Sequence, residues 1–129
     1  RVESGIGQGQ VTATPFGMAM VAASIANGST PSPMIVQGQP GTADKTAPTV
    51  PANVTSDLRT MMRETVTGGT ATALQDIPGL LGKTGTAESG NGPAHGWFVG
   101  IKDDLAFAVF IATGDSSAPA VQAAGRFLR

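Results

Sequence analysis

Four consecutive residues, Lys83-Thr84-Gly85-Thr86, place a cation beside two hydroxyl groups. If the segment is a strand, Thr84 and Thr86 share one face, because side chains alternate along a strand. A carboxylate accepts hydrogen bonds at both oxygens and is drawn to a nearby cation, so this arrangement suits carboxylate binding. Gly85 has no Cβ, which lets another backbone segment come close. Taken alone, Lys83 is better explained as a solvated lysine on an edge strand.

Gly82-Lys83-Thr84 also matches the last three residues of the phosphate-binding loop motif, but the rest of that motif is missing. The glycine expected five residues before Gly82 is replaced by Ile77, and the residues that follow read as a strand end and a loop, where a helix would be needed. The glycine-rich residues 5–10 also fail as a dinucleotide fingerprint, since their sixth position is a glutamine and no strand is visible before them. We interpret them as a turn and expect no cofactor.

The composition is that of a folded globular protein: 40% of the 129 residues are hydrophobic, 13% are charged, and the net charge is −1. The eight basic residues are scattered among nine acidic ones, so we expect no nucleic-acid partner. With no cysteine and one histidine, we expect no disulfide, no cysteine nucleophile and no metal site. The longest apolar stretch, residues 105–112, is too short to span a bilayer as a helix. No signal peptide is visible at the start, so any export signal should lie on sequence outside this chain.

Two helices are predicted in the first half of the chain. The first begins at Thr14-Pro15, an N-cap followed by proline at the first helical position, and ends at the left-handed stop Asn27-Gly28. Its residues are apolar or small on every side, which predicts a helix buried all round. The second, over residues 54–66, has apolar residues at spacings of three and four with charged residues between them. We expect this amphipathic helix on the surface of the core.

Three strands are predicted in the second half, over residues 80–86, 96–101 and 105–113. The last of them has no polar alternation, which is typical of a strand covered on both faces. A short turn at Asp103-Asp104 should join it to the second strand as a hairpin.

A final helix should follow Ser116 or Ser117, with Pro119 in its first turn. Its inward stripe is predicted to hold four residues, Val121, Ala124, Phe127 and Leu128. The chain is therefore predicted to be α+β, with a three-stranded antiparallel sheet covered by helices. Such a sheet needs more helix than these 129 residues offer, so we expect further sequence to complete the domain.

Read on a strand, Lys83-Thr84-Gly85 followed by Thr86 is the third active-site motif of penicillin-binding proteins and class A β-lactamases. Further segments match the same family in its order and with similar spacing: Gly7-Gln8-Gly9-Gln10, Thr14-Pro15, Ala26-Asn27-Gly28, residues 82–88, and Gly96-Trp97-Phe98-Val99-Gly100. Over nearly all of its length, the chain resembles the C-terminal part of the transpeptidase domain of class B penicillin-binding proteins, which are peptidoglycan D,D-transpeptidases.

The resemblance implies a penicillin-binding and serine β-lactamase-like fold and gives roles to the four residues. Lys83 would steer and stabilise negative charge, and the backbone N–H of Thr86 would be a donor of the oxyanion hole. Lys83, Thr84, Gly85 and Thr86 together would bind the substrate. The chain has no Ser-x-x-Lys nucleophile motif, and no Ser-x-Asn motif carries the family's second catalytic serine. Residues 1–129 are therefore predicted to be the C-terminal part of a single transpeptidase domain, inactive when alone.

The family resemblance also implies the reaction. A serine attacks a peptide that ends in D-Ala-D-Ala, forms an acyl-enzyme, and passes the acyl group to an amine of a neighbouring peptide. The implied partners are peptidoglycan stem peptides, β-lactam antibiotics, the N-terminal remainder of the domain and a glycosyltransferase. The implied location is the outer face of the cytoplasmic membrane, with a tether outside this chain. A D,D-carboxypeptidase, a serine β-lactamase, and a β-lactam-sensing or scaffold domain without turnover are the alternatives.

Several residues near the motif are not candidate site residues. Glu88, Ser89, Asn91 and His95 could line the rim of a cleft, but a solvated loop is the simpler interpretation. Trp97 is expected to be a core or cleft-wall aromatic.

Overall fold

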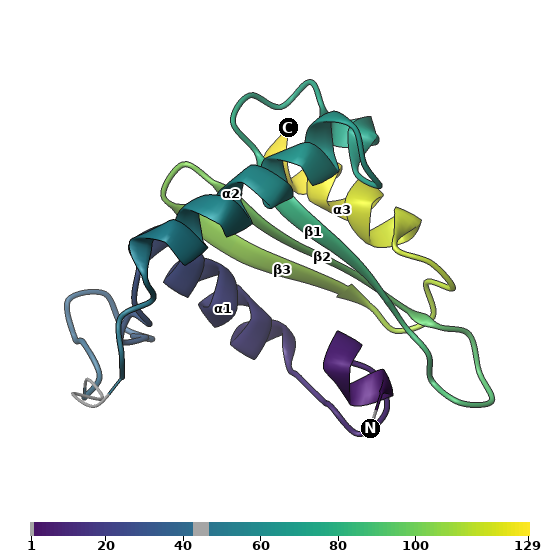
Figure 1. Ribbon diagram of the computed structural model, residues 1–129, viewed down its shortest axis with the longest axis horizontal. Helices are drawn as coiled ribbons and strands as arrows, with labels where there is room; N and C mark the ends of the chain where they lie inside the picture. Colours follow the sequence, from purple (N-terminus) through teal and green to yellow (C-terminus); the bar gives the residue numbers. More distant parts are fainter. Residues whose placement is uncertain (1, 43–46) are drawn as a thin grey trace.

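The computed structural model describes residues 2–42 and 47–129, and their elements follow the predicted order (Figure 1). The elements are the 3-10 turn η1 Glu3–Ile6, helices α1 Pro15–Asn27 and α2 Ala52–Thr67, the 3-10 turn η2 Thr72–Leu74, strands β1 Leu81–Ala87, β2 His95–Lys102 and β3 Leu105–Ile111, and helix α3 Ala118–Leu128. The strands form one antiparallel sheet in the order β1-β2-β3. The predicted α+β class, the three-stranded sheet and the hairpin are confirmed, and each strand limit differs from the prediction by no more than two residues.

The sheet separates two hydrophobic cores, one on each face. Helix α1 packs on one face, where Ala22 is fully buried, and α3 packs on the other, where Ala124 is fully buried (Figure 1). Helix α2 lies beside the start of β1 and contributes to both cores, Met62 to the α1 side and Val66 to the α3 side. The guanidinium of Arg63 on α2 donates to the carbonyl oxygen of the residue before β1 at 2.9 Å. The start of β1 is therefore held by the core on each face of the sheet and by the hydrogen bond from Arg63.

Two glycines of the sheet make room for the phenylalanine rings that fill the α3-side core. Gly82 and Gly100 are paired across β1 and β2. A Cβ at Gly82 would lie 2.3 Å from Cζ of Phe98, and a Cβ at Gly100 would lie 2.5 Å from Cζ of Phe107. Phe98 is fully buried, so its ring has no free space to move into. The glycine directly before the Lys83 motif is therefore required by the core.

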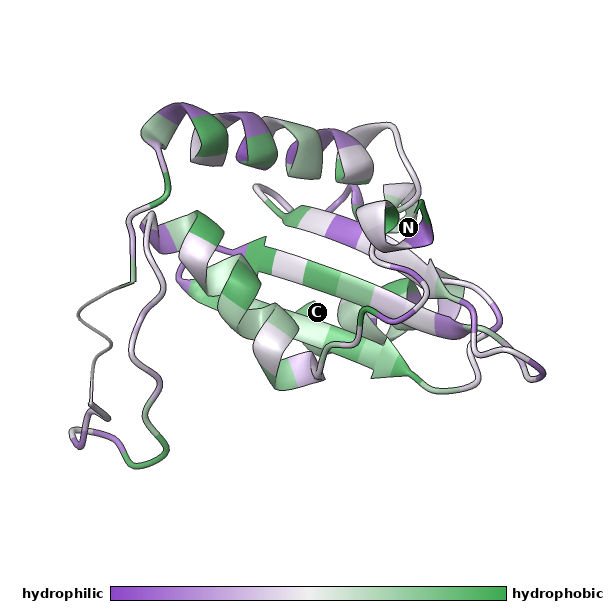
Figure 2. Cartoon of the chain, turned by 60° about the horizontal axis from the view of Figure 1, so that its bottom comes forward, coloured by the Kyte–Doolittle hydropathy of each residue, from purple (hydrophilic) through white to green (hydrophobic). Residues whose placement is uncertain are grey.

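The prediction that α1 is buried all round is wrong, although its ends are as predicted. The Thr14 hydroxyl accepts a hydrogen bond from the Gly17 N–H at 2.9 Å, and Gly28 ends the helix. However, Phe16 is 64% exposed and Val21 is 47% exposed. Figure 2 shows hydrophobic residues around most of α1, whereas α2 alternates hydrophobic and hydrophilic residues. A helix that is apolar on every side is expected to be covered on every side. Within the described residues, neighbouring elements cover only part of α1. No helix of those residues, α1 included, has the length and hydropathy of a bilayer-spanning segment.

Helix α3 follows its predicted stripe except at one position. Val121 and Ala124 are buried, and Leu128 packs against the same core. Phe127 was expected to point inward but is 63% exposed, and its ring reaches the core only through Phe107, with ring centroids 5.7 Å apart. At about 100° per helical residue, Phe127 lies on the margin of the stripe that the other three residues define.

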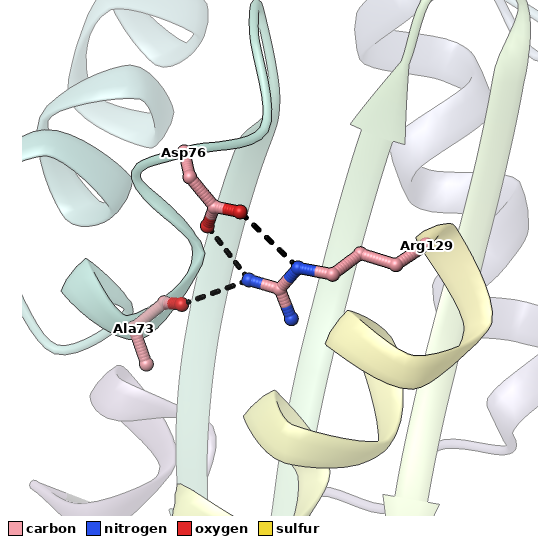
Figure 3. A network of polar contacts seen from close by, with 3 residues as sticks. All are labelled: Ala73, Asp76 and Arg129. Carbon is pink, nitrogen blue, oxygen red and sulfur yellow. Dashed lines mark hydrogen bonds and ion pairs between the residues drawn. The ribbon is translucent and has the colours of Figure 1, made fainter.

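The end of α3 is tied to the turn before β1 by the side chain of Arg129 (Figure 3). Nη2 and Nε of Arg129 donate to the two carboxylate oxygens of Asp76 at 2.6 and 3.2 Å, and Nη2 also donates to the Ala73 carbonyl at 3.2 Å. These hydrogen bonds from Arg129 lower the pKa of the Asp76 carboxyl. Both side chains are about half exposed, so water and salt screen the pair. The contact joins residues 53 apart, and the sequence pattern gave no signal for it.

Candidate functional site

Lys83, Thr84, Gly85 and Thr86 lie on β1 and line one open cleft of about 830 Å³. Strand β1 is at the edge of the sheet, so one side of its backbone has no strand beside it among the described residues. The other walls of the cleft come from the N-terminal residues 6–9 and 11–13, and from aromatic side chains of β2 and β3. The structure therefore brings all four residues of the motif into one cleft.

The two threonines and the lysine belong to opposite faces of β1. Lys83 is paired with Val99, whose side chain is in the α1-side core, whereas Thr84 is paired with Phe98, whose side chain is in the α3-side core. Because side chains alternate along a strand, Thr86 shares the face of Thr84. The threonine hydroxyls and the Lys83 ammonium group can thus act on one ligand only at the free edge of β1, which is reached from both faces.

Lys83 is exposed, and its ammonium group is held close to the strand. Nζ donates to the carbonyl oxygen of Thr84 at 2.6 Å. An ammonium group has three donors, and this bond engages one of them. The side chain is therefore folded against the β1 backbone with a positive charge beside the motif.

Thr84 and Thr86 differ in their surroundings. Thr84 is 8% exposed, and its hydroxyl is 2.5 Å from the hydroxyl of Thr70, which lies in the segment between α2 and η2. Thr86 is exposed to the cleft. A hydroxyl has one proton to donate but can also accept, so Thr84 can still offer its proton to a ligand when Thr70 donates to it.

Gly85 lies opposite Trp97 on β2, on the lysine face of β1. A Cβ at Gly85 would be 3.3 Å from the Cβ of Trp97, which is tighter than ordinary van der Waals contact. The missing side chain thus leaves space above Trp97, whose ring packs against Phe110 with ring centroids 4.8 Å apart. Both aromatic residues line the cleft, so of the two places expected for Trp97, the core or the cleft wall, the structure shows the cleft wall.

The sequence and the fold of the chain can both be compared with those of known proteins. A sequence model of the penicillin-binding protein transpeptidase domain matches residues 2–129. The chain belongs to this family. Among solved structures it is similar to penicillin-binding protein A from M. tuberculosis in its imipenem acyl-enzyme complex, with 27% sequence identity and a TM-score of 0.68. The similarity covers 98% of this chain and 33% of that chain, so the present chain spans about a third of its length. No curated protein sequence matches.

Two side chains from outside the sheet form hydrogen bonds with the motif, and neither of them is predicted to have a role from the sequence. Thr70 lies between α2 and η2, and its hydroxyl meets that of Thr84. Gln8 was part of a glycine-rich turn and of the family match, and its side chain reaches the end of β1. Its Nε2 donates to the Thr86 carbonyl at 2.9 Å, and its Oε1 accepts from the Glu88 N–H at 3.4 Å. The only signal for Gln8 in the sequence is its place between two glycines, in a segment that matches the family.

The loop from β1 to β2 contributes little to the cleft. Glu88 and His95 are among the lining residues, and the Nδ1 of His95 is hydrogen-bonded to the Ala112 carbonyl. Ser89-Gly90-Asn91 has the letters of a Ser-x-Asn motif, but it follows the Lys-Thr-Gly strand of the transpeptidase domain, and the Ser89 hydroxyl donates to a carbonyl of its own loop at 2.8 Å. We therefore do not assign it as the second catalytic serine. The described residues contain no cluster of three or more side chains suited to a metal ion.

Proposed function

We propose that this chain is part of a peptidoglycan D,D-transpeptidase that acts through a serine acyl-enzyme and binds penicillin. One observation carries the proposal: in a chain of the transpeptidase family, β1 lays Lys83, Thr84, Gly85 and Thr86 along an open cleft. We place the nucleophile and its base in sequence that precedes residue 1, because no Ser-x-x-Lys occurs in the 129 residues. On this proposal the 129 residues alone do not form an acyl-enzyme.

The backbone N–H of Thr86 is the proposed oxyanion donor, and the direction of its peptide groups supports this. The Thr86 carbonyl accepts a hydrogen bond from Gln8, which lies outside the sheet. In an extended strand the N–H and the C=O of one residue point to the same side. The Thr86 N–H therefore faces the cleft with its carbonyl, where it could stabilise the negative charge that develops when a serine attacks a carbonyl.

Lys83 is the proposed electrostatic group of the site. Penicillins carry a carboxylate, and so does a peptide that ends in D-Ala-D-Ala. An ammonium group held 2.6 Å from the Thr84 carbonyl places its charge at the cleft before any ligand arrives. Preorganised charge stabilises an anion without further rearrangement, which favours both substrate binding and acyl transfer.

The location and partners of the protein are proposed on the same basis. A peptidoglycan transpeptidase would act at the outer face of the cytoplasmic membrane, tethered by sequence outside this chain. Its partners would be peptidoglycan stem peptides, the N-terminal remainder of the domain and a glycosyltransferase. Fractionation of cells that express the full-length protein tests the location, and recovery from the cytoplasmic fraction would contradict it.

Product analysis tests the proposed reaction. The full-length protein is incubated with a stem-peptide donor and an acceptor that carries a free amine, and the products are identified by mass spectrometry. We expect a cross-linked product with release of D-alanine. Release of D-alanine without cross-linking would favour a carboxypeptidase, and rapid hydrolysis of penicillin would favour a β-lactamase. A stable penicillin adduct without any turnover of stem peptide would favour a sensing or scaffold domain.

A further inference from the structure

Gln8 projects from a turn whose backbone is fixed. It stands between Gly7 and Gly9, whose φ angles of 79° and 71° lie in the left-handed region that favours glycine. The Gln8 N–H donates to the Glu3 carbonyl at 2.9 Å. The turn therefore presents the Gln8 side chain to the cleft in a defined direction.

The Gln8 side chain pairs with β1 as one residue of a neighbouring parallel strand would, with its donor and its acceptor on the same side. Its NH₂ group donates to the Thr86 carbonyl at 2.9 Å, and its oxygen accepts from the Glu88 N–H at 3.4 Å. A carbonyl and the N–H two residues later lie on the same edge of a strand, and one residue of an adjacent parallel strand donates to the first and accepts from the second. One primary amide thus occupies one pairing position on the free edge of β1, and only one orientation of the amide satisfies both bonds.

This contact lies where β1 leaves the sheet. The last pair between β1 and β2 is Ala87 with His95, and Glu88 begins the loop that connects the two strands. The end of a strand frays when its peptide groups have no partner. Gln8 supplies partners to the peptide groups on both sides of Ala87, from a segment about 80 residues away in sequence.

We propose that Gln8 is a positioning residue for the oxyanion hole: by holding the Thr86 carbonyl and the Glu88 N–H, it keeps the end of β1 straight and the Thr86 N–H aimed into the cleft. The proposal deepens the proposed function and rests on it. Gln8 itself does not contact the reacting atoms. Its loss should slow the chemical step of acylation and leave the initial binding of penicillin nearly unchanged.

Three variants of the full-length protein separate this role from a purely structural one. Gln8→Met keeps the length of the side chain but removes the donor and the acceptor. Gln8→Glu keeps an acceptor for the Glu88 N–H but places a carboxylate oxygen against the Thr86 carbonyl. Gln10→Met makes the same change as the first variant at an exposed glutamine that does not line the cleft, and it serves as the matched control.

Two measurements are made on each variant. Stopped-flow acylation by a fluorescent penicillin separates the dissociation constant from the acylation rate constant, and hydrogen exchange reports the protection of the Glu88 amide. Complete loss of one oxyanion donor lowers the rate about 10²- to 10³-fold, so a donor that is loosened but still present should give a smaller loss of about 5- to 30-fold. We expect this loss for Gln8→Met and Gln8→Glu, with less than a twofold change in the dissociation constant and an unchanged rate for Gln10→Met.

The outcomes distinguish the positioning role of Gln8 from the proposed transpeptidase function. Faster exchange at Glu88 in Gln8→Met together with a slower acylation step supports the positioning role. Unchanged exchange shows that the contact does not hold the strand and overturns the inference. Faster exchange with a normal acylation rate, or a normal rate in Gln8→Glu, also overturns it while leaving the proposed function intact. If the unmodified protein is not acylated, the proposed function fails and the inference fails with it.

Discussion

Replacing Thr84 and Thr86 by valine keeps the shape of both side chains and removes the two hydroxyls that we expect to bind a carboxylate. A hydrogen bond to a charged group contributes about 1.5–3 kcal/mol, and 1.4 kcal/mol is a factor of about ten in rate. Thr86 is exposed to the cleft, so water weakens its bond, and we expect Thr86→Val to slow acylation about tenfold. The double variant should lose about 10- to 100-fold, and the backbone N–H of Thr86 is retained.

Thr84 needs its own control because its hydroxyl already meets that of Thr70. Thr84→Val removes this hydrogen bond as well as any bond to the ligand, and should lower the free energy of unfolding by about 1 kcal/mol. Thr70→Val removes the same hydrogen bond but leaves both hydroxyls of β1 in place. We expect Thr70→Val to match Thr84→Val in stability and to keep most of its acylation rate.

The assay compares a penicillin that has a free carboxylate with an analogue whose carboxylate is a neutral ester. Acylation of the full-length variants is followed for both compounds at equal concentrations. The hydroxyls should matter for the free acid and change the ester rate by no more than about twofold, since the ester accepts weaker hydrogen bonds. Equal losses for the two compounds would mean that the hydroxyls act elsewhere, and the assignment of Thr84 and Thr86 to carboxylate binding would have to be withdrawn.

Three further predictions concern the charge, the core and the pH dependence. Lys83→Ala should slow acylation about 10²-fold or more with little effect on folding, as for the loss of a preorganised electrostatic group, and an unchanged second-order acylation rate in the folded variant would contradict the role of Lys83. Gly82→Ala should lower the free energy of unfolding by about 1–3 kcal/mol in denaturant titrations, because its Cβ would overlap the buried ring of Phe98. Gly85→Ala serves as the control and should lower the free energy of unfolding less. Equal stabilities of the two variants would show that the Phe98 ring has room to move. Because Arg129 lowers the pKa of Asp76, their pair should add stability above about pH 4, and this gain should disappear as the pH falls through the lowered pKa and on adding salt. Arg129→Met should therefore reduce the melting temperature at pH 7 but not near pH 2, and an equal reduction at both values would assign the effect to packing.

The parts of the fold that could be predicted are those that local sequence determines. Thr14 and Gly28 mark the ends of α1 because capping acts within one turn of a helix, and the structure has both caps. The hairpin of β2 and β3 follows from a short turn between two apolar runs, and Asp103 there has a φ of 53°. The motif on β1 was recognisable because its four residues are consecutive.

The rest depends on neighbours that are distant in sequence. The exposure of Phe16 and Phe127 depends on which elements pack around their helices. Neither the hydrophobicity of the two residues nor the spacing of apolar residues along each helix shows which elements these are. The hydrogen bond from Gln8 to Thr86 spans 78 residues, and it forms only because the glycine-rich turn comes to lie beside the free edge of β1. The sequence therefore indicated the chemistry of the site but not the contacts that hold it in place.

The most direct test of the account is the position of the acyl group in a structure of the full-length protein after reaction with penicillin. The account predicts that the acyl carbonyl oxygen lies about 2.7–3.1 Å from the backbone nitrogen of Thr86, with the penicillin carboxylate near Lys83 and the two threonines. It also predicts that the acylated serine belongs to sequence before residue 1. An acyl group on a serine of the present 129 residues, or a carbonyl oxygen that is not hydrogen-bonded to Thr86, would contradict the proposed site.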